Sequence, residues 1–208
     1  MTEDTRGHGR DTIELPAPRM EGKMPVEAAL AARRSIRRYR NDPLTLEETS
    51  QLLWSVQGIT SPEGYRTAPS AGPCFPLETY LVTGTVDGLA PGMYRYHPRG
   101  HRIELLFEGD IRDQLVAAAQ GQRFIARAPV SLVFSACYER TTKRYGERGI
   151  RYVHMDVGHA GENLHIQAAA MGLGTVVVGA FTDAEVKRVL RLPAGEDPLY
   201  IMPVGRVE

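Results

Sequence analysis

Residues 151–181 read RYVHMDVGHAGENLHIQAAAMGLGTVVVGAF, and this stretch predicts the element around which the fold is built. Apolar residues recur in it at three- and four-residue steps, which places them on one face of a helix. The members of this row are Val153, Val157, Ala160, Leu164, Ala168 and Met171. A second row follows another side of the helix through Met155, Ile166 and Ala170. Because a helix that is apolar on more than one side is typically buried, we expect a central helix over residues 151–171.

The residues that follow this helix predict a strand. Gly172 and Gly174 can adopt the left-handed conformation that ends a helix, and the β-branched residues 175–178 favour a short strand. A membrane-spanning helix is excluded, because charged and amide side chains lie in mid-helix. These side chains are Asp156, His159, Glu162, Asn163 and His165.

The composition is that of a neutral chain of one domain. The 208 residues include 25 basic and 25 acidic side chains, so no overall charge indicates nucleic acid or a membrane surface as a partner. Two cysteines, Cys74 and Cys137, are too few for a disulfide scaffold and suit a reducing compartment. Residues 1–22 are polar and rich in proline and glycine, which predicts a flexible arm before a domain over residues 23–208. The first residues lack an apolar run, so we expect no signal peptide and a cytoplasmic location.

The rest of the chain predicts a mixture of helices and strands. Helices are expected over residues 25–32, 45–57, 110–119 and 183–190, with a capping box of Thr45 and Glu48 and with Asp110 and Asp183 as caps. Strands are expected over residues 78–83, 92–97, 101–106, 129–137 and 199–207, the last with an edge or a bulge at Pro203. The charged residues 138–150 are expected to form a loop. Because helices and strands do not alternate strictly, the fold class is α+β.

A cluster of arginines is the first candidate binding segment. Residues 33–40 read RRSIRRYR, and guanidinium groups beside a serine hydroxyl can bind a phosphate dianion through several donors. The same residues also suit a solvated basic turn or a nucleic-acid patch. The octapeptide alone does not decide between these alternatives.

Three further segments could contribute to a site. Residues 68–76, APSAGPCFP, place glycine and proline where backbone amides could face a flat ring, although an ordinary surface loop has the same composition. Gly179 follows a predicted strand and permits close approach of a ligand. Arg206, near the C-terminus, is a second guanidinium that could reach a phosphate. Each segment alone is weak evidence for a binding site. The segments together, in this order along the chain, are stronger evidence.

Taken together, these segments resemble the nitroreductase-like family of FMN-dependent enzymes. The resemblance covers residues 25–208, and its most specific part is the stretch RYGERGIRYVHMDVGHAGENLHIQAAAMGLGTVVVGAF that begins at Arg144. Within the family, the sequence is most similar to the SagB-type dehydrogenases, which oxidise azoline rings in modified peptides. The resemblance implies an α+β fold with a mixed, mainly antiparallel sheet around a long central helix. It also implies an intertwined homodimer with two flavins at the interface.

The resemblance further implies which residues would bind FMN. Arg33, Ser35 and Arg37 match the family's phosphate and ribityl motif, with Arg34 contributing mainly backbone. The family's flavin loop matches Pro69, Ser70, Ala71 and Gly72, which would come from the second subunit and lie against the isoalloxazine. Val178, Gly179 and Ala180 would approach the pyrimidine or N5 edge of the flavin, and Arg206 would join the phosphate cluster.

The sequence departs from the family pattern at two places. Azoline-oxidising members carry a Lys-Tyr pair that removes a substrate proton, and the matching pair here is Arg144-Tyr145. An arginine does not give up its proton in proteins and is a poor general base. Many nitroreductases also carry Asn in the flavin loop, where this chain has Pro73-Cys74. Both departures weaken the assignment of the substrate more than the assignment of the cofactor.

The substrate and the electron donor stay open at the level of sequence. We expect a small-molecule or peptide-borne substrate, with NAD(P)H as a transient donor, because no Gly-x-Gly-x-x-Gly follows a strand. The alternatives are an NAD(P)H-dependent nitro or quinone reductase and a non-catalytic flavin-binding protein. A nucleic-acid partner is not expected at zero net charge. No metal site is expected, because the histidines of the central helix do not have the HExxH spacing.

Overall fold

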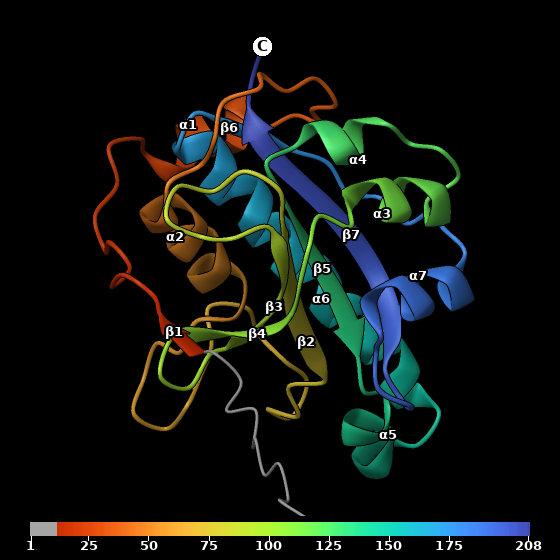
Figure 1. Ribbon diagram of the computed structural model, residues 1–208. Coiled ribbons are helices and arrows are strands. Elements are labelled where there is room, and N and C mark those ends of the chain that lie inside the picture. Colours follow the sequence, from red (N-terminus) through yellow and green to blue (C-terminus); the bar gives the residue numbers. More distant parts are fainter. Residues whose placement is uncertain (1–11) are drawn as a thin grey trace, which may run out of the picture.

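A seven-stranded sheet forms the centre of the computed structural model, which describes residues 12–208 (Figure 1). The strand order is β1-β4-β3-β2-β5-β7-β6, and every pairing between these strands is antiparallel. The strands are β1 (Thr12–Glu14), β2 (Leu77–Thr83), β3 (Gly92–His97), β4 (Arg102–Glu108), β5 (Val130–Ala136), β6 (Leu173–Thr175) and β7 (Asp197–Arg206). The expected α+β class with a mainly antiparallel sheet is confirmed.

Helices cover both faces of this sheet, and each face has its own hydrophobic core (Figure 1). One face packs against α2 (Leu46–Gln57) and α6 (Arg148–Ala170). The other packs against α3 (Arg112–Ala118), α4 (Phe124–Arg127) and α7 (Asp183–Leu190). Successive residues of a strand point to opposite faces, so Leu81 joins the first core while Tyr80 and Val82 join the second. The short helices α1 (Val26–Ala32) and α5 (Glu139–Tyr145) pack against α6.

Helix α6 is the long central helix that the sequence predicts, and it begins three residues earlier than expected. Its first apolar row is buried against the sheet from Val153 to Ala168, while Met171 lies just past the helix and is partly exposed. Burial of one aliphatic side chain contributes roughly 1.5–3 kcal/mol. The second row is not buried in the single chain, because Met155 is 49% exposed and Ile166 and Ala170 are partly exposed. The expectation that α6 is buried on more than one side is therefore wrong for the single chain, because residues 12–208 leave the second row partly exposed.

The start of α2 follows the predicted capping box. The Thr45 hydroxyl accepts a hydrogen bond from the Glu48 amide at 3.1 Å, and the Glu48 carboxylate accepts one from the Thr45 amide at 2.9 Å. A cap of this kind contributes about 1 kcal/mol to helix stability. The helix ends where Gly58 was expected to end it, and the Gly58 amide donates to the Trp54 carbonyl at 2.7 Å.

Part of the expected N-terminal arm lies on the domain. Residues 1–11 fall outside the described residues, but Thr12–Glu14 form β1 and pair with β4. The chain then follows α2, where the Ser50 hydroxyl donates to the Pro16 carbonyl at 2.6 Å and the Arg19 amide donates to the Gln51 side chain at 2.8 Å. These contacts involve backbone groups of Pro16 and Arg19, so the polar, proline-rich composition of the segment could not predict them.

The prediction of a loop over residues 138–150 is wrong. These residues form α5 and the first turn of α6, with Gly146 between the two helices. Gly149 does not break the structure but allows the helices to touch, because a Cβ on it would lie 2.9 Å from the Thr142 Cα. An ion pair between Glu139 and Lys143 at 3.2 Å spans one turn of α5.

The expected boundaries around the last strands also need correction. Gly172 ends α6 with φ +70°, as expected, but Gly174 lies inside β6, where a Cβ would be 2.7 Å from the Ile36 Cβ. The predicted strand over residues 175–178 is thus shifted: β6 begins at Leu173 and ends at Thr175. Pro203 is not on an edge strand, because β7 lies between β5 and β6, and the register shift of the β5–β7 pair lies at another position, between Phe134 and Ser135.

Two expected caps differ from the structure. Helix α3 begins at Arg112 with Ile111 as N-cap, and Asp110 instead binds the Arg112 amide at 3.0 Å and its guanidinium at 2.7 Å. Helix α7 has Thr182 as N-cap, with Asp183 in its first turn. Both aspartates still lie near a helix N-terminus, where a negative charge is favourable.

Candidate functional site

Residues 33–40, which we call the basic segment, lie beside the ends of β6 and β7. The Ile36 amide donates to the Thr175 carbonyl and the Arg40 amide donates to the Arg206 carbonyl, both at 2.9 Å. Ser35 and Thr175 form a parallel bridge. These backbone bonds fix the path of the segment, while the side chains of Arg34, Ser35 and Arg37 stay exposed.

The guanidinium groups of the basic segment have few carboxylate partners among the described residues. Arg33 lies 3.9 Å from the Glu162 carboxylate, and both side chains are partly exposed. Arg34 folds back to donate to the carbonyls of Ala31 and Arg33. Arg37 lies over the Phe124 ring at 5.9 Å. The segment thus presents more positive charge than its neighbours neutralise.

Arg206 lies close to this segment in the fold but already has a partner. Its guanidinium donates to both oxygens of Glu48 at 3.0 Å. The same carboxylate completes the capping box of α2. A phosphate bound at this place would share Arg206 with Glu48. The sequence identified Glu48 as a capping residue and gave no indication of this second contact.

The segment 178–180 follows β6 and runs on beside β7. Val178 pairs with Ile201 of β7, and Gly179 and Ala180 are exposed. The Ala180 carbonyl accepts a hydrogen bond from the Gln122 side chain at 2.9 Å. A Cβ built on Gly179 would meet no atom within 4 Å, so open space lies beside this backbone.

The 69–75 loop belongs to a second group of residues, at the N-terminal half of α6. The Ser70 hydroxyl donates to the Asp156 carboxylate at 2.7 Å, and the Ala71 amide donates to it at 3.3 Å. The Phe75 amide donates to the Ser70 oxygen at 3.0 Å. Asp156 is only 4% exposed, and this burial raises the pKa of its carboxyl, while the bonds from Ser70 and Ala71 oppose the rise.

Arg144 and Tyr145 pack on this same loop. The Arg144 guanidinium donates to the Gly72 carbonyl at 3.1 Å and lies 5.4 Å from the centre of the Tyr145 ring. The Tyr145 ring meets the Tyr152 ring edge to face, with centroids 5.1 Å apart. A Cβ on Gly72 would lie 2.3 Å from the Tyr145 hydroxyl, so the loop and the pair are in close contact.

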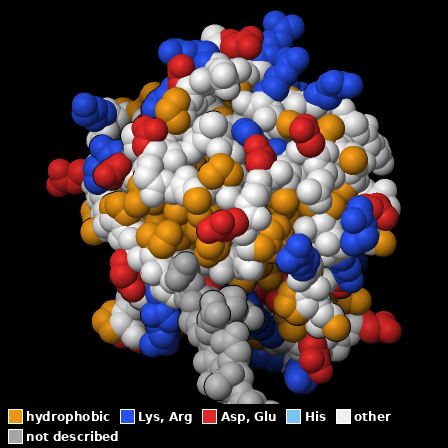
Figure 2. Space-filling model, viewed as in Figure 1, with side chains coloured by type: hydrophobic (Ala, Val, Ile, Leu, Met, Phe, Trp, Pro, Cys, Tyr) orange, Lys and Arg blue, Asp and Glu red, His pale blue; other side chains and the backbone are white. Residues whose placement is uncertain are grey.

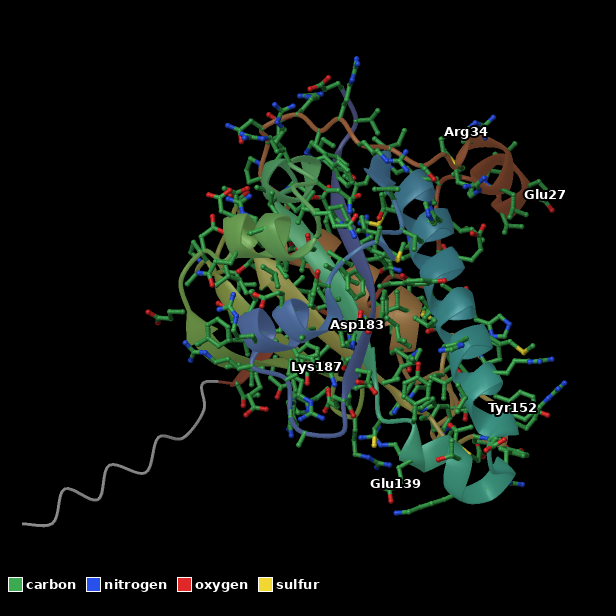
Figure 3. All side chains as sticks on the ribbon, turned by 90° about the vertical axis from the view of Figure 1, so that its right-hand side faces the viewer. Glu27, Arg34, Glu139, Tyr152, Asp183 and Lys187 are labelled. Carbon is green, nitrogen blue, oxygen red and sulfur yellow. The ribbon has the colours of Figure 1, made fainter. Side chains whose placement is uncertain are left out.

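The two groups lie along different parts of α6, because Ser70 binds Asp156 and Arg33 lies near Glu162, six residues or about 9 Å further along the helix. Figure 3 shows Arg34 near the C-terminal end of this helix and Tyr152 toward its N-terminal end. With 23 residues, α6 is about 35 Å long at 1.5 Å per residue. The structure places the predicted phosphate-binding residues beside Thr175 and Arg206, and residues 178–180 follow three residues after Thr175, where Val178 pairs with Ile201 of β7. It brings the 69–72 segment together with Arg144 and Tyr145, and it keeps the two groups apart within one chain.

A groove of about 840 Å³ lies on the exposed side of α6. It is lined by residues 19–24, by α1 and α2, and by Ile166 and Ala170 of the second apolar row of α6. Glu48 lines it near Arg206, and Thr67 lines it just before the 69–75 loop. The groove therefore reaches from the first group of residues toward the second.

Neither metal ligands nor a membrane helix are found in the part of the chain that the structure describes. No three His, Cys, Asp or Glu side chains of residues 12–208 are grouped so that they could hold a metal ion. Within the same residues, none of the helices combines the length and the apolar character that crossing a membrane requires. Figure 2 shows positive and negative side chains interspersed over one face, with a band of hydrophobic side chains between them.

Comparison with known proteins identifies the family of this chain. The sequence pattern of the Nitroreductase family matches residues 30–206. The chain belongs to the nitroreductase family. Members of this family are typically FMN-dependent oxidoreductases. The resemblance inferred from the basic segment, the 69–75 loop and the central helix is confirmed at this level.

Two nitroreductase relatives match almost the whole chain. A protein of Methanocaldococcus jannaschii that is named as a nitroreductase is 45% identical over 196 residues, which cover 94% of this chain and 98% of the relative. The crystal structure of a Ralstonia eutropha protein, also named as a nitroreductase, is 31% identical with a TM-score of 0.83. This match covers 95% of this chain and 90% of that one.

Similarity to SagB-type processing proteins is more distant. The trifolitoxin-processing protein TfxB of Rhizobium leguminosarum is 28% identical over 151 residues, which are 69% of this chain. The chain spans only 40% of that relative's length. The chain is therefore similar to this branch over part of the relative's length only.

Proposed function

We propose that the protein is an FMN-dependent oxidoreductase that acts as a homodimer. In this proposal the basic segment and Arg206 of one chain bind the FMN phosphate, and residues 178–180 line the flavin ring. The 69–72 segment of the second chain lies against the same ring. The observation that carries the proposal is the separation of the two groups along α6, because one chain alone offers each half of a site without the other.

The donor groups of the basic segment fit an FMN phosphate. Arg37 has no carboxylate partner among the described residues, Arg33 lies as far as 3.9 Å from the Glu162 carboxylate, and Ser35 is exposed. A phosphate dianion favours such forked donors. The open space beside Gly179 leaves room for a flat ring to approach the backbone. The residues present therefore suit the cofactor that is typical of the family.

The exposed side of α6 supports the dimer. Met155 is 49% exposed and Ile150 is 45% exposed on α6, and Val26 and Leu30 of the neighbouring α1 are 56% and 50% exposed. Large apolar side chains that stay exposed in the single chain are typical of a protein interface. A second copy packed along this face would bury the second apolar row, as the sequence pattern predicts. It would also bring the 69–72 segment of one chain toward the basic segment of the other.

When bound, FMN supplies the N5 atom through which a hydride is accepted and donated. The protein residues bind and orient the cofactor. Gln122 holds the Ala180 carbonyl and so fixes the backbone of Gly179, whose amide is available for a hydrogen bond near the ring edge. Arg144 donates to the Gly72 carbonyl and is therefore a support for the loop, since a guanidinium does not remove a substrate proton.

The position of Arg144 bears on the choice of substrate. The azoline oxidation of SagB-type enzymes needs a base at the position that Arg144 occupies. Reduction of a nitro compound or a quinone with electrons from NAD(P)H needs no such base. The contact between Arg144 and Gly72 thus favours the NAD(P)H-dependent reductase over oxidation of a peptide-borne ring. If neither donor nor acceptor turns over, a flavin-binding protein without catalysis is the remaining alternative.

Removing two guanidinium groups tests the phosphate assignment. The double variant Arg33→Ala, Arg206→Ala should lose most of its bound FMN while keeping the dimer and the fold. Arg188→Ala is the control, because Arg188 pairs with Glu185 on the surface of α7. Bound FMN is measured by absorbance after gel filtration. A double variant as yellow as the parent would show that the phosphate lies elsewhere.

A further inference from the structure

We propose that Asp156 is a positioning residue for the flavin-facing loop, acting through Ser70 and the Ala71 amide. This inference rests on the proposed function for its role toward FMN. It assigns to the central helix a task beyond packing, because α6 would set the shape of the loop that meets the cofactor of the second chain.

The contacts between α6 and the 69–75 loop form a connected chain of hydrogen bonds. One carboxylate oxygen of Asp156 accepts from the Ser70 hydroxyl at 2.7 Å, and the other accepts from the Ala71 amide at 3.3 Å. The Ser70 oxygen in turn accepts from the Phe75 amide at 3.0 Å. One buried carboxylate therefore connects both ends of a six-residue turn.

These bonds change what Ser70 offers to a ligand. Its hydroxyl proton is directed to Asp156, and its oxygen already accepts from Phe75. The side chain of Ser70 is thus used inside the loop. The groups left to face a flavin ring are the backbone of Ala71 and Gly72 and the methyl group of Ala71. The flavin loop then acts through the shape of its backbone, which Asp156 holds.

The loop has a conformation that needs such support. Phe75 has φ +45° and Gly72 has φ +58°, and a side-chain residue such as Phe75 rarely adopts a left-handed conformation. Strained backbone of this kind persists only where surrounding contacts determine it. Arg144 supplies a second support from α5, through the Gly72 carbonyl. Asp156 and Arg144 together hold the loop from two helices.

The buried charge is difficult to explain by packing alone. Asp156 is 4% exposed in a helix whose neighbouring inward positions, Val153, Val157 and Ala160, are apolar. Burial of a carboxylate costs free energy unless hydrogen bonds compensate. An alanine or a valine would pack at this position without that cost. The two bonds to the loop are the compensation, and they indicate that the carboxylate serves to fix the loop.

The thiol of Cys74 reports on the loop without any cofactor. Cys74 lies inside the loop, partly buried, with its sulfur 3.5 Å from the Gly72 carbonyl oxygen. In a Cys137→Ser background it is the remaining cysteine of the chain. The rate of its alkylation by iodoacetamide then measures how often the loop opens.

Asp156→Asn should raise this rate by about tenfold, which corresponds to about 1.4 kcal/mol. The amide keeps one acceptor oxygen but turns an NH₂ group toward the Ala71 amide. Asp183→Asn is the charge-matched control on the surface of α7, where the rate should not change. Ser70→Ala removes the same network from the loop side and should raise the rate similarly, and the double variant should be no faster than either single one.

A second readout connects the loop to FMN. The Kd of FMN for Asp156→Asn should rise by about tenfold, and the visible circular dichroism of the saturated flavin should change, while the urea midpoint stays near that of the parent. Unchanged alkylation in both Asp156→Asn and Ser70→Ala would overturn the proposal, and Ser70→Ala alone decides if Asp156→Asn does not fold. A parent that binds no FMN would refute the proposed function, and the alkylation rates would still decide the role of Asp156.

Discussion

Gly72→Ala is the substitution that tests the contact between the loop and the Arg144-Tyr145 pair. An alanine at φ +58° costs roughly 1–2 kcal/mol, because its Cβ crowds the backbone in the left-handed region. The new Cβ would also lie 2.3 Å from the Tyr145 hydroxyl, so this ring must move. Moving it loses the edge-to-face contact with Tyr152, which is worth about 0.5–1.5 kcal/mol. We expect the free energy of unfolding to fall by about 2–3 kcal/mol.

Urea unfolding of matched variants separates the two contributions. Gly64→Ala is the control for the backbone, because Gly64 has φ +90° and a Cβ there meets nothing within 4 Å. It should lose only the backbone contribution. Tyr145→Phe removes the hydroxyl that the new Cβ would strike, so it should recover about 1 kcal/mol in the Gly72→Ala background. A coupling free energy of zero between Gly72→Ala and Tyr145→Phe would refute the contact.

Two further predictions concern the interface and the response to pH. Met155→Asp puts a charge on the exposed apolar side of α6 and should convert the proposed dimer to monomer in analytical ultracentrifugation; an unchanged sedimentation coefficient would place the interface elsewhere. Burial alone raises the pKa of Glu78, but hydrogen bonds and charge from Arg95 and Arg140 outweigh it and lower this pKa below its usual 4.5. The stabilisation from Glu78 is therefore complete above about pH 4.5 and is lost as the pH falls through the lowered value. Glu78→Gln should flatten the acid limb of the stability curve, and parallel curves for parent and variant would contradict this.

Much of the fold follows from local patterns that the sequence displays openly. The capping box of Thr45 and Glu48 predicts the start of α2 because both partners lie within one turn. The alternating and apolar runs predict β2, β3 and β5 within one or two residues of their bounds. The apolar row from Val153 to Ala168 predicts α6, since a buried helix face repeats at a fixed spacing.

Helix α5 was missed because its pattern is weak. Residues 139–145 read ERTTKRY, in which Thr141 is the buried position, so no apolar row is visible. Gly146 and Gly149, which both follow this segment, also suggest a loop. In the structure, Gly149 allows α5 and α6 to approach closely, which depends on a neighbour that the sequence does not name.

The exception at Pro203 has a similar cause. A proline inside a sheet is expected on an edge because it lacks an amide proton. Pro203 lies in the inner strand β7, where its carbonyl accepts from the Tyr39 hydroxyl at 3.2 Å. On the side of β7 opposite β5, β6 pairs only with residues 204–206. The proline therefore faces a gap between partners, which only the full sheet reveals.

Some features of the candidate site could be recognised in the sequence, and others appear only in the structure. The basic segment and the 69–72 segment could be proposed as candidates from their composition, their order along the chain and the resemblance to the family. The contacts of Asp156 with Ser70, of Glu48 with Arg206 and of Gln122 with Ala180 could not, because each joins residues far apart in the sequence. Asp156 was noted only as a charge that excludes a membrane span.

The most direct test of the proposed function is the visible absorption spectrum of the purified protein, followed by heat release and chromatographic identification of the chromophore. The proposal predicts a flavin spectrum and the release of FMN, with about one FMN per chain if each half-site is completed by the second copy. A colourless protein that also fails to take up added FMN would contradict it.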